Sequence, residues 1–180
     1  MEELLKQTKA YLNYIEEHYN NVQEAWKIVQ NKCSDMEFIW DDFEFNYLNK
    51  EIECHDFSKL TTNEFTAYRA KFFPLSVMES GGVSVNNCMI NIEFESAWDN
   101  HKNKNDHHWQ TWTTIKYGYP RMQHIHCVHM LVDWIAMSMK FGDTAIEYYN
   151  KNKHQMNTLP DWTDEFIMDI LNKVYSKENK

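Results

Sequence analysis

The stretch that decides the fold runs from Arg121 to Met139 and reads RMQHIHCVHMLVDWIAMSM. Its apolar residues recur every three or four positions, which is the spacing of a helix that packs into a core. They are Met122, Ile125, Val128, Leu131, Val132 and Ile135. Asp133 lies in the middle of this apolar helix. Because a buried carboxylate costs free energy unless it meets a cation, Asp133 is a candidate ligand.

The composition favours the same kind of structure for the whole chain. Only four Gly and three Pro occur among 180 residues, whereas 43% of the residues are hydrophobic and bulky Met, Trp, Tyr and Phe are plentiful. Few turn-forming residues disfavour a β architecture and suit long helices. The length suits one domain with its own core. We therefore expect an all-α fold, with residues 1–180 forming a single helical bundle whose core spans about 2–175.

Apolar spacing predicts further helical segments at 2–31, 36–48, 90–101 and 161–175. Gly142 is expected to end the apolar helix, and Asp143 or Thr144 is expected to cap the next one. These signals divide the chain into helices joined by short turns.

The middle of the chain carries weaker signals. Thr61 and Glu64 fit a capping box before a helix that Pro74 ends. The stretch from Val83 to Met89 is the only place where a short strand is expected. Residues 102–106 have no apolar side chain and weak helix propensity, so we expect a loop there.

Potential metal ligands are spread along the chain in the order H…HD…H…HH…D. They are His18, His55, Asp56, His101, His107, His108 and Asp133. An imidazole and a carboxylate on consecutive residues, with a distant His and a distant Asp, supply the nitrogen and oxygen ligands that borderline divalent metals take. The pattern predicts that His18, His55, Asp56 and Asp133 bind a divalent transition metal. It does not distinguish Mn, Fe, Co and Zn.

The same residues lie in motifs that resemble the HD-domain superfamily of metal-dependent phosphohydrolases. The motifs are His18-x-x-Asn21-Val22, His55-Asp56-x-Ser58-Lys59, Glu64-Phe65-x-x-Tyr68, Asn105-x-His107-His108 and Asp133-Trp134-x-Ala136-Met137. Together they are similar to a short uncharacterised HD-like family of bacteria and phages, over roughly residues 11–150. The resemblance implies a helical bundle with a metal site between helices, and hydrolysis of a phosphoester.

The resemblance also implies roles for individual residues. HD proteins carry a His-Asp-x-Gly-Lys form in which the Lys suits an anionic oxygen of the substrate, and Ser58 replaces the Gly here. Asp56, Lys59 and His107 are therefore candidate catalytic residues, with Lys59 and His107 facing the substrate. In the alternative, Lys59 is a solvated surface residue.

The number of metal ions is left open. In two-metal HD proteins, additional histidines complete a second coordination shell, which would make His101 and His108 ligands of a second ion bridged by Asp56. In the one-ion alternative, His101 and the pair His107-His108 bind the substrate phosphate. His129 lies four residues before Asp133 and either supports the ligands from behind or packs or faces solvent.

The aromatic residues that follow the histidine pair bear on the substrate. They are Trp109, Trp112, Tyr117 and Tyr119. They either stack on a nucleobase, with Trp109 as the first candidate, or fill the core. HD-like proteins commonly act on nucleotides, so a nucleotide or related phosphoester is the expected substrate.

Charge and cysteine usage restrict the partners and the compartment. The net charge of −9 disfavours binding to duplex nucleic acid, so a small anionic substrate must meet local cations. No apolar run approaches the ~20 residues that cross a bilayer, and residues 1–6 lack the features of a signal peptide. The four cysteines are scattered without a C-x-x-C pair. We expect a cytoplasmic protein with reduced thiols that does not contact membranes.

Our leading hypothesis is a metal-dependent phosphohydrolase that uses a metal-activated water. The first rival is a di-iron oxygenase that resembles myo-inositol oxygenase, because such enzymes hold two irons with an H…HD…H…H…D set and carry a similarly placed Lys. The second rival is a non-catalytic protein that binds a nucleotide or signalling molecule. The oligomeric state is not predicted.

Overall fold

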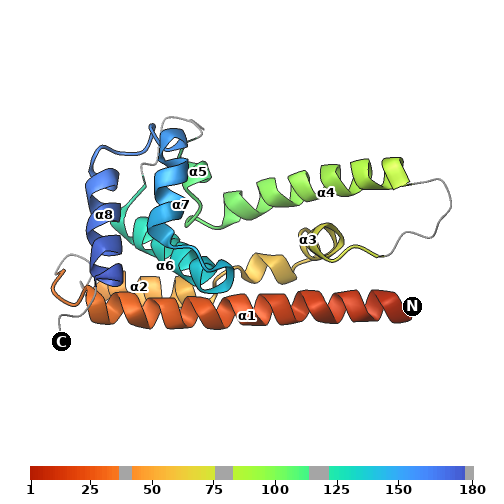
Figure 1. Cartoon of the computed structure of the whole chain (residues 1–180), viewed down its shortest axis with the longest axis horizontal. Helices are drawn as coiled ribbons and strands as arrows, with labels where there is room; N and C mark the ends of the chain where they lie inside the picture. Colours follow the sequence, from red (N-terminus) through yellow and green to blue (C-terminus); the bar gives the residue numbers. More distant parts are fainter. Residues whose placement is uncertain (37–41, 76–82, 114–121, 177–180) are drawn as a thin grey trace. The chain divides into compact units, whose positions relative to one another are not determined.

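The structure, a computed structural model, describes residues 1–36, 42–75, 83–113 and 122–176, and these residues form helices joined by turns (Figure 1). The α-helices are α1 (Glu2–Lys32), α2 (Asp42–Glu53), α3 (Phe65–Phe72), α4 (Val83–Lys104), α5 (Trp109–Thr113), α6 (His124–Phe141), α7 (Ala145–Asn152) and α8 (Trp162–Tyr175). Two short 3-10 helices, η2 (Phe57–Leu60) and η3 (Lys153–Gln155), complete the described elements. No strand occurs in these ranges, so the predicted all-α class is confirmed.

The helices belong to two units. The first unit comprises Met1–Glu17 and Asp56–Asn105, and the second unit comprises His18–His55 and Asp106–Lys180. The long helix α1 therefore contributes its first half to the first unit and its second half to the second unit. Each unit has its own cluster of buried apolar side chains. The expectation of one domain over residues 1–180 stays a prediction.

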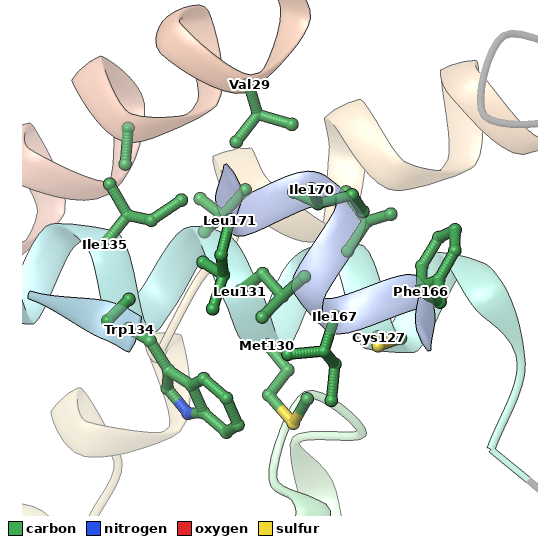
Figure 2. Packing of buried hydrophobic residues seen from close by; sticks show 14 of the residues in the cluster. Val29, Cys127, Met130, Leu131, Trp134, Ile135, Phe166, Ile167, Ile170 and Leu171 are labelled. Carbon is green, nitrogen blue, oxygen red and sulfur yellow. The ribbon is translucent and has the colours of Figure 1, made fainter. Parts of the chain in front are cut away.

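The core of the second unit forms around α6, the helix predicted from the apolar stretch. Helix α6 packs against α2, α7 and α8. Figure 2 shows Leu131 of α6 beside Ile167 and Leu171 of α8, with Val29 of α1 pointing toward the same cluster. Burial of each such side chain stabilises the fold by about 1.5 to 3 kcal/mol. The apolar face of α6 thereby holds Asp133 on a rigid element.

Helix α6 ends, and helix α7 begins, at the capping residues predicted from the sequence. Gly142 adopts a left-handed conformation with φ 79°, which glycine tolerates without a side-chain clash. The hydroxyl of Thr144 accepts a hydrogen bond from the Glu147 amide at 3.2 Å, and the Glu147 carboxylate accepts one from the Thr144 amide at 2.8 Å. This reciprocal pair is a capping box at the start of α7. The predicted ends of these helices are confirmed.

The core of the first unit is smaller and mainly aromatic. Helix α3 packs against α4. The rings of Tyr68 and Phe94 meet edge to face at a centroid distance of 5.1 Å, and those of Tyr11 and Phe65 do so at 5.2 Å. Edge-to-face aromatic pairs add about 0.5 to 1.5 kcal/mol beyond the area that they bury. The first unit thus fixes α3 and α4, which carry Glu64 at the start of α3 and His101 on α4.

Two local expectations for the first unit were wrong. The capping box of Thr61 and Glu64 does not form: Glu64 itself precedes α3 and makes no side-chain cap, and the Thr61 hydroxyl donates to the Ser58 carbonyl at 2.6 Å. The possible strand from Val83 to Met89 lies inside α4. At Glu64 the buried contacts of its side chain with Ser58, Asn100 and His101 outweigh the local preference for a capping box.

The expected loop at 102–106 is also mostly helix, because α4 continues to Lys104. Two contacts account for the extra turn. Lys102 pairs with Asp99 at 2.6 Å, and the side-chain amide of Asn105 donates to the His101 carbonyl at 2.7 Å. A side chain that satisfies a carbonyl of the last turn stabilises a helix end.

Helix α2 begins at Asp42, and the earlier part of the predicted segment 36–48 falls mainly on residues 37–41, outside the described residues. Tyr117 and Tyr119 also lie outside the described residues. In the part of the chain that is described, no helix combines the length and apolar character that crossing a membrane requires.

Candidate metal centre

Three of the predicted ligands meet in the second unit. His18 lies on α1, His55 in the turn after α2 and Asp133 on α6. The Nε2 atoms of His18 and His55 are 3.0 Å apart, and Asp133 Oδ1 lies 3.2 Å from His18 Nε2 and 3.6 Å from His55 Nε2. Ligand atoms that share an ion at about 2.1 Å lie about 3.0 to 3.4 Å from one another in octahedral or tetrahedral geometry. The distances from His18 Nε2 to His55 Nε2 and to Asp133 Oδ1 fit that spacing, and the distance of 3.6 Å between His55 Nε2 and Asp133 Oδ1 is slightly longer.

Asp133 has the charge that a metal ligand requires. Burial alone would raise the pKa of its carboxyl group, but the hydrogen bonds and charges of His18 and His55 hold that pKa well below its usual range. The carboxylate is therefore ionised at neutral pH. Its position inside an apolar helix is explained by these two partners, as the sequence led us to expect.

His129 contacts the Nδ1 side of the His55 ring. His129 Nε2 lies 2.9 Å from His55 Nδ1, and both rings are buried. If His55 Nδ1 carries the hydrogen and donates it to His129, the lone pair of His55 Nε2 faces His18 and Asp133. His129 is buried, so the alternative in which it faces solvent is wrong, and its role as a support of the ligands rather than a packing residue stays a prediction. The sequence signal was its position one helical turn before Asp133 on α6.

The histidine pair lies beside this group in the second unit. The ring of His107 is centred 4.5 Å from His55, 4.4 Å from His129 and 4.2 Å from His108. His55, His107 and His129 each offer a nitrogen, and these three atoms lie within 4.8 Å of one another, so they form a group that could hold a metal ion. The predicted roles of His107 in catalysis and substrate binding, and of His108 as a metal ligand, stay predictions.

Asp56 belongs to the first unit, although it follows His55 directly in sequence. Its backbone is left-handed, with φ 57° and ψ 18°, at the residue before η2. Among non-glycine residues mainly Asn and Asp adopt this conformation, and it stores strain typical of functional sites. The proposal that Asp56 shares an ion with His18, His55 and Asp133 stays a prediction.

Lys59 pairs with the Asp56 carboxylate. Its Nζ contacts Asp56 Oδ2, and its side chain is only 12% exposed. The ammonium group also lies 5.6 Å from the centre of the Tyr68 ring. The alternative in which Lys59 is a solvated surface residue is therefore wrong. Binding of a substrate anion by Lys59 stays a prediction.

His101 is fully buried between two carboxylates of the first unit. Its Nε2 lies 3.1 Å from Asp56 Oδ1, and its Nδ1 lies 2.8 Å from Glu64 Oε2. Burial lowers the pKa of the His101 imidazole, but the carboxylates of Asp56 and Glu64 raise that pKa by more. The net shift of the pKa is therefore upward. His101 thus lies against Asp56, and its predicted role as a metal ligand stays a prediction.

Glu64 was not identified as a site residue from the sequence. Its position suggested a helix cap, whereas its side chain is fully buried and contacts Ser58, Asn100 and His101. The available signal was its place beside Phe65 in the motif that follows Lys59. Only the contact with His101, 37 residues away in sequence, shows its relation to the site.

Trp109 lies in the core of the second unit. Its side chain is buried in the main apolar cluster at the start of α5. Trp112 donates a hydrogen bond to the Asp106 carbonyl at 2.7 Å and stacks on His126. These contacts agree with the core-filling alternative for both residues. Contact of Trp109 with a substrate stays a prediction.

The fold and the site together define a class: an all-helical protein in which buried histidine and aspartate groups could hold a metal ion. The chain belongs to the Family of unknown function (DUF5662), whose model matches residues 7–175. No curated protein and no solved structure matches the chain.

Proposed function

We propose that this chain is a metal-dependent phosphohydrolase of the HD type that acts on a nucleotide or related small phosphoester. The observation that carries the proposal is the convergence of His18 Nε2, His55 Nε2 and Asp133 Oδ1 at 3.0 to 3.6 Å. Two imidazole nitrogens and one carboxylate oxygen suit a divalent transition metal. His18, His55 and Asp133 would hold such an ion, which would lower the pKa of a bound water and so supply a nucleophile for attack on phosphorus near neutral pH.

The remaining polar residues of each unit supply binding and charge. The Lys59 ammonium is a buried cation held by Asp56, and it binds an anionic phosphoryl oxygen. His107 offers a buried imidazole beside His55 and His129, and it offsets charge on the departing group. The resemblance to HD proteins supports the reaction class, and hydrolysis of nucleotides follows from that resemblance by analogy.

Phosphate release should depend on added metal. Protein stripped with a chelator is expected to release no phosphate from a panel of nucleotides and simple phosphoesters, and reloading with Mn²⁺, Fe²⁺, Co²⁺ or Zn²⁺ should restore release. The stripped protein should keep its helical circular dichroism, because the apolar core of the second unit does not involve the metal ligands.

The same preparations test the rival functions. Protein purified without oxygen would contain two irons per chain and consume oxygen without phosphate release if it were an oxygenase. A protein that retains a nucleotide but never turns it over would be a binding protein. Either result would overturn the proposed hydrolase function.

Lys59→Ala should lower kcat/KM for the phosphoester by about 100-fold, because a buried cation that stabilises transferred charge is lost. Metal content should stay full, since Lys59 is not a ligand. The matched control is Lys102→Ala, which removes a partly exposed Lys that also pairs with an Asp three residues before it. Equal kinetics for both variants would contradict the role of Lys59 in substrate binding.

A further inference from the structure

We propose that Glu64 is a positioning residue that fixes the ring orientation and tautomer of His101, so that His101 Nε2 presents its lone pair to a metal ion. This inference rests on the proposed metal centre and extends it to a residue that is itself no ligand. All the groups that carry it belong to the first unit.

The Glu64 carboxylate is built into a closed set of contacts. The hydroxyl of Ser58 donates to Oε2 at 2.9 Å, and the side-chain amide of Asn100 donates to Oε1 at 2.6 Å. His101 Nδ1 lies 2.8 Å from Oε2. Glu64 is fully buried. A buried carboxylate is costly unless several donors surround it, so these contacts define where the carboxylate lies.

The donors around His101 Nδ1 determine its tautomer. Ser58 gives its hydroxyl hydrogen to Glu64, and Asn105 donates to the Ser58 oxygen at 2.9 Å. The Asn105 amide nitrogen also lies 3.2 Å from Nδ1, but its two hydrogens are donated to the Ser58 oxygen and to the His101 carbonyl. Nδ1 therefore faces a carboxylate oxygen and a hydroxyl oxygen whose hydrogen is donated to Glu64, and we infer that Nδ1 is the nitrogen that carries the hydrogen. In the neutral ring the lone pair is then on Nε2.

That lone pair points to an acceptor. His101 Nε2 and Asp56 Oδ1 are 3.1 Å apart, which is the spacing of two ligand atoms on one cation. A carboxylate that accepts the second ring hydrogen of a metal-binding His raises its basicity and holds its orientation, and loss of such a partner typically costs 10-fold to 100-fold in metal affinity. Glu64 is such a carboxylate, because its Oε2 lies beside His101 Nδ1.

The test is a titration of metal-free protein with Co²⁺. Calorimetry measures the affinity, and visible absorption spectroscopy records the bands of bound Co²⁺. Glu64→Gln keeps the size of the side chain but removes its charge, and it should weaken Co²⁺ binding about 10-fold to 100-fold and shift the absorption bands. The control is Tyr11→Phe, which removes a buried hydroxyl of the same unit that contacts the Lys59 carbonyl and not His101. It should leave affinity and spectrum unchanged.

A double-mutant cycle with His101→Ala separates positioning from general support of the fold. If Glu64 acts through His101, adding Glu64→Gln to His101→Ala should not weaken Co²⁺ binding further. Equal reductions in both backgrounds, or a wild-type spectrum and affinity for Glu64→Gln, would overturn the inference. If Glu64→Gln does not fold, Glu64→Asp replaces it, because the shorter side chain keeps the charge but withdraws it from Nδ1.

Failure of the inference and failure of the proposed function give different results. Wild-type protein that binds Co²⁺ and hydrolyses phosphoesters, with Glu64→Gln indistinguishable from it, overturns only the role of Glu64. Wild-type protein that binds no Co²⁺ overturns the metal centre and the inference together.

Discussion

Asp56→Asn is expected to lower phosphoester turnover by about 1000-fold or more, which corresponds to about 4 kcal/mol in activation free energy. The substitution keeps the size of the side chain and tolerates the left-handed backbone of this residue, so it removes little besides the charge. The lost carboxylate charge should also lower the metal content. The measurements are phosphate release, metal analysis and helical circular dichroism, and the last should stay nearly unchanged.

A closely matched control is available in the same unit. Asp99→Asn also removes a carboxylate that pairs with a Lys three residues later, but that carboxylate is 65% exposed. It should leave turnover and metal content unchanged. If Asp56→Asn behaves like Asp99→Asn, Asp56 is not a ligand. If apo-protein and Asp56→Asn are both unfolded, the metal is structural and the case for a catalytic role weakens.

Leu131→Ala should lower the free energy of unfolding by about 2 to 5 kcal/mol. Leu131 is fully buried in the core of the second unit, where Figure 2 shows it between residues of α8. The truncated side chain loses its apolar burial and leaves a cavity that the packed helices fill only in part. Chemical denaturation followed by circular dichroism gives the measurement.

Met139→Ala on the same helix provides the comparison, because Met139 is 40% exposed. Its effect should stay within about 0.5 kcal/mol. Similar losses for the two variants would show that α6 does not form the centre of a packed core. A loss confined to Leu131→Ala would support the role of α6 as the element that holds Asp133 in place.

Much of the second unit follows from local sequence signals. The apolar period of α6 depends only on residues three or four positions apart, and the conformational freedom of Gly142 depends on its missing side chain. Asp133 was identified because its charge contradicts the apolar pattern around it. Each of these properties is visible within one or two helical turns of sequence.

The residues that contact the predicted ligands could be identified only from contacts between distant segments of the chain. Glu64 and His129 meet His101 and His55 across 37 and 74 residues, and no local pattern encodes such distances. The left-handed conformation of Asp56 is likewise a property of the turn in which it lies. The end of α4 was predicted too early, because side-chain contacts such as the donation of the Asn105 amide to the His101 carbonyl offset the weak helix propensity of residues 102–106.

The burial of the Lys59 and Asp56 pair makes it less sensitive to ionic strength than an exposed pair. In the pair of Lys102 and Asp99 the carboxylate is 65% exposed, so dissolved ions screen its attraction. Lys59 and Asp56 are 12% and 6% exposed, so dissolved salt screens their attraction much less. Only an ion that enters into direct contact separates them: a cation that replaces the ammonium or an anion that replaces the carboxylate. In a chain of net charge −9, a ligand that binds in direct contact with the pair can therefore separate the two charges, whereas the dissolved salt around the protein weakens their attraction little.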